Sequence, residues 1–189
     1  MKWWEKTIEY LFIINGVKNR KLNLSPLDGN HELAGDLIAA HDAKFFLIEF
    51  KSQYSAIISE HEKFYRFELA KRSLENRDGH HFVVYGELSE SNPCTLKLNA
   101  QTYFSQIEKP IDDIFISGID GSNFKAYLQE YIDFKIPPIS GSGGGRSLNF
   151  GMVAAVDTKT GSASTMSLDE FMINLSLTKN HTKTFSMGM

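Results

Sequence analysis

Two acids and a lysine lie in one short, otherwise apolar stretch of the chain, and these residues are the most capable of chemistry. Asp36 comes just before one apolar segment, and Glu49 and Lys51 lie at the end of the next. If Asp42 and Ala43 form a two-residue turn between two strands, counting back from that turn places Asp36 directly opposite Glu49. Because side chains alternate along a strand, Lys51 projects to the same face as Glu49. The three polar groups are therefore expected to converge.

This convergence is costly unless a cation lies between the two acids. Directly opposed residues of antiparallel strands hold their Cβ atoms about 4.5–5.5 Å apart, a distance at which two carboxylates repel each other. Burying acids among apolar residues also costs free energy unless the acids are paired or bind a metal ion. Mg²⁺ prefers oxygen ligands and keeps several waters, so two carboxylates and one main-chain carbonyl suffice to hold it. Such a cation can neutralise phosphate charge and activate water, which phosphodiester hydrolysis requires.

Structural alternatives explain the same residues without this metal. Asp36 would cap the start of its strand, and Glu49 would form an ion pair with Lys51 at the end of the next. Nearby histidines offer a metal ligand or a base, although each is more often a polar surface residue. They are His31, His41 and His61. The pair His80-His81 has no partner motif such as HExxH, which disfavours a zinc site.

The helix expected before this stretch carries two further acids. Apolar spacing predicts an amphipathic helix over residues 3–14. Glu5 and Glu9 lie one turn apart on its flank. A short strand over residues 22–24 and turn-forming residues over 25–30 would connect this helix to the apolar stretch.

A helix and a strand are expected after the stretch. Ser59 and Glu62 fit a capping box at a helix start. A buried stripe continues this helix to about Arg77, and its lysines and arginines form either a solvated face or a phosphate-facing surface. Residues 81–85 predict a strand. Since the two strands around the turn are apolar on both faces, the sheet is expected to be covered on both sides, as in a layered α/β domain.

The second half of the chain gives weaker signals. The predicted elements are strands over 95–98, 114–116 and 150–156, and helices over 100–108, 124–132 and 167–177, the last capped by Ser167 and Glu170. A Gly/Ser-rich segment breaks the chain. We therefore divide the chain into a domain at 1–138, a loop or linker at 139–147, and an appendage at 148–189 that is either separate or part of the same domain.

Composition restricts the cellular setting and the partners. The 189 residues include one cysteine, Cys94, which excludes an internal disulfide and suits a reducing cytosol. No apolar segment is long enough to span a membrane, so we expect no membrane partner and a cytoplasmic location. The formal net charge of −3 provides no general attraction to nucleic acid, so such binding must use a local patch.

Asp36, followed thirteen positions later by Glu49-Phe50-Lys51, resembles the motif of the PD-(D/E)xK nuclease superfamily. Gly35 stands where the motif's proline would be. The expected order of helix, three strands, helix and strand over about residues 3–86 is also that of the superfamily's core. The resemblance therefore implies an α/β fold with a restriction-endonuclease-like αβββαβ core, a mixed central sheet flanked by helices, here with additional C-terminal α/β elements.

The resemblance also implies residue roles. Asp36 and Glu49 would bind Mg²⁺, for which Mn²⁺ can substitute, with the main-chain carbonyl of Phe50 as a third ligand. Lys51 would orient or deprotonate the attacking water, or stabilise charge on the phosphate, and the sequence leaves this choice open.

Many relatives also carry a glutamate on the first helix. Glu9 is preferred to Glu5 for this role, because it adjoins Ile8 on the apolar side of the predicted helix and can lean toward the sheet.

Three function classes follow. The first is a metal-dependent nuclease that acts on DNA rather than RNA, in phage defence, restriction or repair, alone, as a homodimer or with a protein partner. The second, favoured by the acidic net charge, is an inactive nuclease-like fold that binds protein or nucleic acid. The third is a metal-dependent phosphohydrolase for small substrates. Stabilisation by a divalent ion separates the enzymes from the binding module, and salt-sensitive DNA binding separates the two enzymes.

Overall fold

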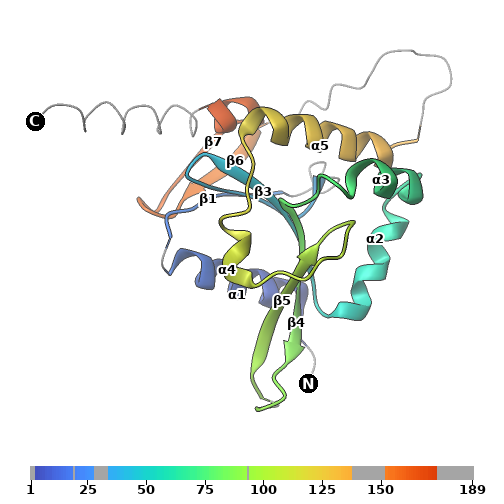
Figure 1. Ribbon diagram of the computed structural model, residues 1–189. Helices are drawn as coiled ribbons and strands as arrows, with labels where there is room; N and C mark the ends of the chain where they lie inside the picture. The colour runs from blue at the N-terminus through green and yellow to red at the C-terminus, as the bar shows by residue number, and fades with distance from the viewer. Residues whose placement is uncertain (1–2, 19, 28–33, 93, 138–151, 174–189) are drawn as a thin grey trace, which may run out of the picture.

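A computed structural model of the protein describes residues 3–18, 20–27, 34–92, 94–137 and 152–173, and it contains one seven-stranded sheet (Figure 1). The strand order across the sheet is β5-β4-β3-β2-β1-β6-β7. β3 and β4 run parallel, and every other neighbouring pair is antiparallel. The bounds are Asn23–Pro26 for β1, Leu37–His41 for β2, Lys44–Lys51 for β3, His81–Leu88 for β4, Leu96–Thr102 for β5, Met152–Asp157 for β6 and Ser162–Ser167 for β7.

The hairpin of β2 and β3 has the register that the sequence predicts. Its turn residues, Asp42 and Ala43, both have positive φ, 49° and 59°, which is the backbone of a two-residue hairpin turn. Antiparallel pairing runs along the whole of β2, from His41 opposite Lys44 to Leu37 opposite Ile48, so the predicted register of the hairpin is confirmed. Asp36 lies one residue before the first pair, and its N–H donates a hydrogen bond to the carbonyl of Ile48 at 3.1 Å.

Helices cover both faces of the sheet (Figure 1). α1 (Glu5–Val17) and α4 (Ile111–Ile114) pack against one face. α3 (Phe67–Leu74) and α5 (Gly121–Lys135) pack against the other. Each face has its own apolar core, because the central strands carry buried apolar side chains in both directions. The expected layered α/β architecture, a mixed sheet flanked by helices, is therefore confirmed.

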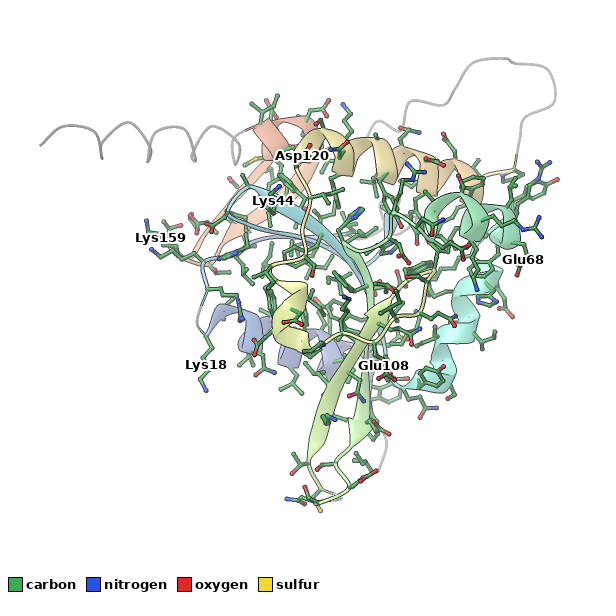
Figure 2. The ribbon with its side chains drawn as sticks, in the orientation of Figure 1. Lys18, Lys44, Glu68, Glu108, Asp120 and Lys159 are labelled. Atoms are coloured by element: carbon green, nitrogen blue, oxygen red, sulfur yellow. The ribbon has the colours of Figure 1, made fainter. Side chains whose placement is uncertain are left out.

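Charged side chains gather at the periphery of these layers. Figure 2 shows Lys18, Glu68 and Lys159 projecting outward, and all three are exposed. Within the described ranges, no helix is both long and apolar enough to cross a membrane.

The helix predicted over residues 59–77 is interrupted. Its pieces are the α-helices α2 (Ser59–Glu62) and α3 (Phe67–Leu74), and the 3-10 helix η2 (Tyr54–Ile58) directly precedes α2. At the interruption Phe64 turns inward and packs edge-on against the buried ring of Tyr131 on α5, with ring centroids 5.5 Å apart. This tertiary contact outweighs the continuous helical periodicity of the sequence.

Of the two predicted capping boxes, one is wrong and one is confirmed. The Oγ of Ser59 donates a hydrogen bond to the carbonyl of Ala56 at 2.8 Å and caps no helix. The Oγ of Ser167 accepts from the N–H of Glu170 at 3.1 Å, and the Glu170 carboxylate accepts from the N–H of Ser167 at 2.8 Å. This reciprocal pair begins a helical segment at residues 168–173.

For two segments in the second half of the chain, the predicted type of secondary structure is wrong. Residues 100–102 continue β5, with Ala100 paired to Val84 of β4, where a helix was expected. Residues 111–114 form α4, although a strand was expected from residue 114. Tertiary contacts explain both differences. β5 pairs with β4 along its whole length, and Ile114 is fully buried on the face of the sheet that α1 covers. The predicted helix over 124–132 is confirmed as part of α5.

The C-terminal strands join the same sheet as the first half. β6 pairs with β1, and β7 pairs with β6. Residues 152–167 therefore extend the sheet beyond β1. The predicted linker at 139–147, the end of the helix predicted over 167–177, and the chain from residue 174 onward lie outside the described residues.

His80 and His81 lie in the core at the start of β4, each at most 2% exposed. The ring of His81 stacks on Tyr103 with centroids 4.1 Å apart, and its Nδ1 lies 2.9 Å from the hydroxyl of Tyr127. Burial, reinforced by Arg77, lowers the pKa of His80 to about 4. Burial also lowers the pKa of His81 well below its ordinary value. Both rings are therefore held neutral inside the protein.

We expect acid to destabilise the fold through these histidines. In the unfolded chain His80 becomes protonated below a pH of about 6.5, whereas in the folded protein it becomes protonated only near pH 4. The free energy of unfolding should therefore fall as the pH falls from 6.5 to 4, by roughly 3 kcal/mol from His80 alone. Denaturant unfolding at a series of pH values measures this slope. His80→Asn should reduce the dependence of the unfolding free energy on pH, whereas His41→Asn, at the hairpin turn, should leave it unchanged. Equal pH dependence in the two variants would contradict the prediction.

Candidate functional site

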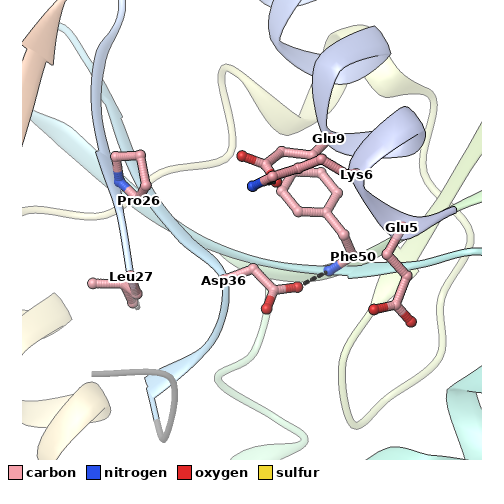
Figure 3. Close-up of a pocket in the computed structure, with 7 residues that line it drawn as sticks. All are labelled: Glu5, Lys6, Glu9, Pro26, Leu27, Asp36 and Phe50. Atoms are coloured by element: carbon pink, nitrogen blue, oxygen red, sulfur yellow. Dashed lines mark hydrogen bonds and ion pairs between the residues drawn. The ribbon is translucent and has the colours of Figure 1, made fainter. Parts of the chain in front are cut away.

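The candidate site lies at the C-terminal end of β3, beside the start of β2. Asp36 directly precedes β2 and is half-buried, and its Oδ2 accepts a hydrogen bond from the N–H of Phe50 at 2.6 Å (Figure 3). In a strand the N–H and C=O of one residue point to the same side. The carbonyl of Phe50 therefore faces the same side of β3 as the Asp36 carboxylate.

Glu49 is completely buried at this end of β3. Its Oε1 accepts hydrogen bonds from the Nζ of Lys51 at 3.1 Å and from the Nζ of Lys63. Its Oε2 is buried and has no hydrogen-bond partner among the described residues. A buried, unpartnered carboxylate oxygen is costly, and a cation is one group that satisfies it.

Glu60 and Lys63 complete a buried ionic cluster that sequence reasoning missed. Glu60, on α2, is 2% exposed. Its Oε1 lies 2.7 Å from the Nζ of Lys51 and 2.8 Å from the Nζ of Lys63. Its Oε2 accepts a hydrogen bond from the hydroxyl of Tyr103 at 2.7 Å. The predicted ion pair of Glu49 with Lys51 is therefore one contact in a cluster of two acids and two lysines.

One sequence signal could have found these residues. The buried stripe of Ala70 and Leu74, extended backward at helical spacing through Phe67, reaches Lys63 and Glu60. The sequence predicts a capping box around Glu60, which is wrong, and a charged helix surface that includes Lys63. Lys63 keeps 37% of its side chain exposed, and its Nζ also reaches the carboxylates of Glu49 and Glu60.

A cavity of about 340 Å³ opens between α1 and the start of β2 (Figure 3). It is lined by Glu5, Lys6, Glu9, Pro26, Leu27, Asp36 and Phe50. Glu9, the preferred first-helix acid, pairs with Lys6 at 2.7 Å, whereas Glu5 Oε1 lies 3.8 Å from the Nζ of Lys51. Both glutamates therefore border the site, and Glu5 is the one in contact with the central lysine.

Burial and crowding oppose ionisation of the two predicted metal ligands. Burial raises the pKa of Asp36. Burial, followed by repulsion from Asp36 and Glu60, raises the pKa of Glu49 to about 7, although two lysines lie beside it. A divalent cation would favour the ionised form of both carboxylates, because an opposite charge nearby lowers the pKa of an acid.

The ion pairs with Glu60 have the opposite consequence. Burial alone would raise the pKa of Glu60, but Lys51 and Lys63 lower it to about 2. Burial would likewise lower the pKa of Lys51 and of Lys63, but attraction by Glu49 and Glu60 outweighs it and the pKa of both lysines is raised. Both lysines are therefore held as ammonium groups in this cluster.

The other candidates from the sequence do not join the site. His41 lies at the hairpin turn, the opposite end of β2 from Asp36, and the ring of His61 stacks on Phe67 at 3.7 Å. His31 lies outside the described residues. Cys94 is exposed.

The residues at the end of β3 fit a hard cation only through a small protein ligand set. Within the described ranges, no three His, Cys, Asp or Glu side chains are grouped so as to hold a metal ion. The set that the resemblance implies is the carboxylates of Asp36 and Glu49 and the Phe50 carbonyl. The unpartnered Oε2 of Glu49 and the shared orientation of the Phe50 carbonyl and Asp36 suit Mg²⁺ or Mn²⁺, which keep several waters.

Comparisons with protein-family models, with curated proteins and with solved structures found no match for this chain.

Proposed function

We propose that this chain is a divalent-metal-dependent nuclease of the PD-(D/E)xK type. The observation that carries the proposal is the environment of Glu49. This buried carboxylate has one oxygen without a hydrogen-bond partner among the described residues, adjoins Phe50, whose N–H donates to the Asp36 carboxylate, and contacts the ammonium of Lys51. An apolar sheet that retains two acids with raised pKa values beside a lysine is typical of a reaction centre more than of a structural ion pair.

The residues have distinct roles in this proposal. Asp36, Glu49 and the carbonyl of Phe50 hold Mg²⁺ or Mn²⁺, and the bound cation supplies charge neutralisation at the phosphate and a more acidic water. Lys51, held as an ammonium, orients the attacking water and stabilises negative charge on the phosphate. Deprotonation of the water is the third role that the resemblance leaves open for Lys51.

The fold is consistent with this proposal. The chain begins with α1, β1, β2 and β3, continues through the helices η2, α2 and α3, and then enters β4, which is parallel to β3. This is the αβββαβ order that the resemblance implies. The proposed catalytic residues lie at the strand end from which the chain crosses to the parallel strand β4.

DNA is the proposed substrate, with contacts supplied by a local basic patch. Arg66 and Arg72 are exposed near α3, and Lys63 has 37% of its side chain exposed beside Glu49. α3 packs against the same face of the sheet as the ionic cluster. These cations would contact backbone phosphates and would make binding sensitive to salt. Phage defence, restriction or repair in the cytoplasm remains the proposed setting, alone, as a homodimer or with a protein partner.

A specific observation favours the alternative, an inactive binding module. The Oε1 atoms of Glu49 and Glu60 each contact both Lys51 and Lys63, so the cluster is already charge-compensated without a cation. A buried cluster of this kind can hold α2 against the sheet without doing chemistry. Metal binding and cleavage separate the two functions.

We expect Mn²⁺ to raise the melting temperature of the protein. A ligand that binds only the folded state at 100 times its Kd stabilises it by about 2.7 kcal/mol. Thermal melting with and without Mn²⁺ measures the shift, and isothermal titration calorimetry measures the Kd. Asp36→Ala and Glu49→Ala should abolish the shift, whereas Glu62→Ala, an exposed acid on α2, should retain it. A shift of equal size in all four proteins contradicts the assigned site.

Cleavage is tested on linear, nicked, branched and single-stranded DNA and on RNA, each with Mg²⁺ or Mn²⁺. The nuclease proposal expects metal-dependent cleavage of at least one DNA substrate and salt-sensitive binding. Cleavage of a small phosphodiester without DNA binding would support a small-substrate phosphohydrolase instead. No metal binding and no cleavage would support the binding module.

A further inference from the structure

Lys51 is held by a carboxylate from a separate element of the fold. Its Nζ lies 2.7 Å from Oε1 of Glu60 on α2 and 3.1 Å from Oε1 of Glu49 on its own strand. Glu5 of α1 is the third acid near this ammonium, at 3.8 Å. Glu60 thus makes the shortest contact with Lys51, and it does so from a side chain that is itself 2% exposed.

The carboxylate of Glu60 is itself held in place by a hydrogen bond from the protein core. Its second oxygen, Oε2, accepts a hydrogen bond of 2.7 Å from the hydroxyl of Tyr103. Tyr103 is 4% exposed, and its ring is stacked on the buried ring of His81. The core of the protein therefore sets the position of the hydroxyl, the hydroxyl sets the Glu60 carboxylate, and the carboxylate sets the ammonium of Lys51.

This support matters because a lysine side chain is flexible. Four rotatable bonds separate the ammonium from the backbone, so the strand alone does not fix where the charge lies. A reacting constellation needs its groups held within about 0.5 Å of the productive geometry, by neighbours that are themselves locked by packing and hydrogen bonds. Of the two acids in closest contact with Lys51, Glu49 is the one assigned to the metal in the proposed function, which leaves Glu60 to hold the lysine.

We propose that Glu60, held by Tyr103, is a positioning residue that fixes the ammonium of Lys51 for phosphodiester cleavage. The inference rests on the proposed nuclease function, in which Asp36, Glu49 and the carbonyl of Phe50 hold the metal ion. Glu60 also contacts Lys63, at 2.8 Å, and the inference concerns its contact with Lys51.

A double-mutant cycle tests this dependence on a substrate that the wild-type chain cleaves with Mn²⁺. Glu60→Gln should lower kcat by roughly 10–100-fold with little change in KM, the usual scale for losing a residue that orients a reacting group. In the Lys51→Met background the same substitution should change kcat by less than about 3-fold, because the group that Glu60 positions is gone. An equal loss of kcat in both backgrounds would mean that Glu60 is only structural and would overturn the inference.

Tyr103→Phe provides a milder variant that keeps the aromatic packing and removes only the hydrogen bond to Glu60. It should lower kcat by about 3–10-fold in the wild-type background and have no effect in Glu60→Gln, since the two residues act in series. Thermal melting identifies variants that are unfolded at the assay temperature. An effect of Tyr103→Phe that is as large in Glu60→Gln as in the wild type overturns the proposed order of support.

Amine-selective labelling gives a readout that does not depend on cleavage. Lys51 should react slowly in the wild type and at least about 5-fold faster in Glu60→Gln, while the exposed Lys125 reacts equally in both, because a released lysine side chain regains its rotamer freedom and reaches solvent. Unchanged labelling of Lys51 contradicts its fixation by Glu60. If the wild type binds Mn²⁺ and cleaves DNA but the double-mutant cycle shows no coupling, the positioning role of Glu60 is overturned and the proposed nuclease function stands. If the wild type cleaves nothing, the proposed function fails and the role of Glu60 in cleavage fails with it.

Discussion

Replacing Glu49 with glutamine is expected to lower metal-dependent cleavage by at least about 10³-fold while the protein stays folded. The amide has nearly the shape of the carboxylate but carries no charge, so it should bind a divalent cation much more weakly. The loss corresponds to about 4 kcal/mol of transition-state stabilisation, which is within the range that a metal ion supplies.

The fold should tolerate this change for a local reason. Burial and neighbouring acids already raise the pKa of Glu49 to about 7, so a neutral side chain at this position suits its surroundings. Glu60 still pairs with Lys51 and Lys63, so neither lysine is left without a carboxylate. The melting temperature without metal should therefore stay equal or rise, and its rise with Mn²⁺ should disappear.

The measurements are kcat/KM with Mn²⁺ and melting curves with and without the ion. Glu62→Gln is the matched control, since it is the same substitution at an exposed acid on α2. Full activity in Glu49→Gln would remove Glu49 from the proposed mechanism. Loss of activity together with unfolding would leave the charge untested in that variant, and Asp36→Asn, at a half-buried position, then provides the same comparison with less risk to the core.

Asp78→Ala is expected to lower the free energy of unfolding by about 3–5 kcal/mol, the largest structural effect that we predict. Asp78 is 2% exposed. Its Oδ2 accepts from the N–H groups of Phe104 and Ser105, both at 2.7 Å, and its Oδ1 accepts from the Oγ of Ser105 at 2.8 Å. Removing the carboxylate leaves two backbone donors without their acceptor at the turn after β5, where Phe104 is buried.

Urea unfolding of Asp78→Ala and Asp169→Ala compares the free energy lost with a buried hydrogen-bond acceptor with that lost with a surface ion pair. Asp169 pairs with Lys125 at 2.6 Å, but both side chains are 58% exposed, so its loss should cost less than about 1 kcal/mol. Asp78→Asn should fall between the two, because an amide retains one acceptor oxygen. Equal destabilisation by the two alanine variants would contradict the account given for Asp78.

The sequence by itself determined the centre of this protein. The two-residue turn at Asp42 and Ala43 and the alternation of side chains along each strand specify the register. From these features the sequence predicts that Asp36 lies near Glu49 and that Lys51 projects to the same face as Glu49. These features were predictable because they depend on neighbours within a few residues, where turn geometry and the period of two leave few alternatives.

Tertiary structure decided the surroundings of that centre. Lys63 contacts Glu49, and Glu60 contacts Lys51, across separations in the sequence at which local spacing does not specify partners. Helical spacing indicates that Glu60 and Lys63 lie on the buried side of their helix, but not which residues they meet. The same reason explains why residues 100–102 continue a strand and why α4 replaces an expected strand.

Which first-helix glutamate contacts the site, Glu5 or Glu9, also depends on the tertiary structure. On the helix the two acids are one turn apart, and spacing alone ranked Glu9 first. In the folded protein Glu9 pairs with Lys6, and Glu5 approaches Lys51. Sequence periodicity specifies which face of a helix is buried, but which residue on that face meets a given partner depends on the angle at which the helix crosses the sheet, and packing alone sets that angle.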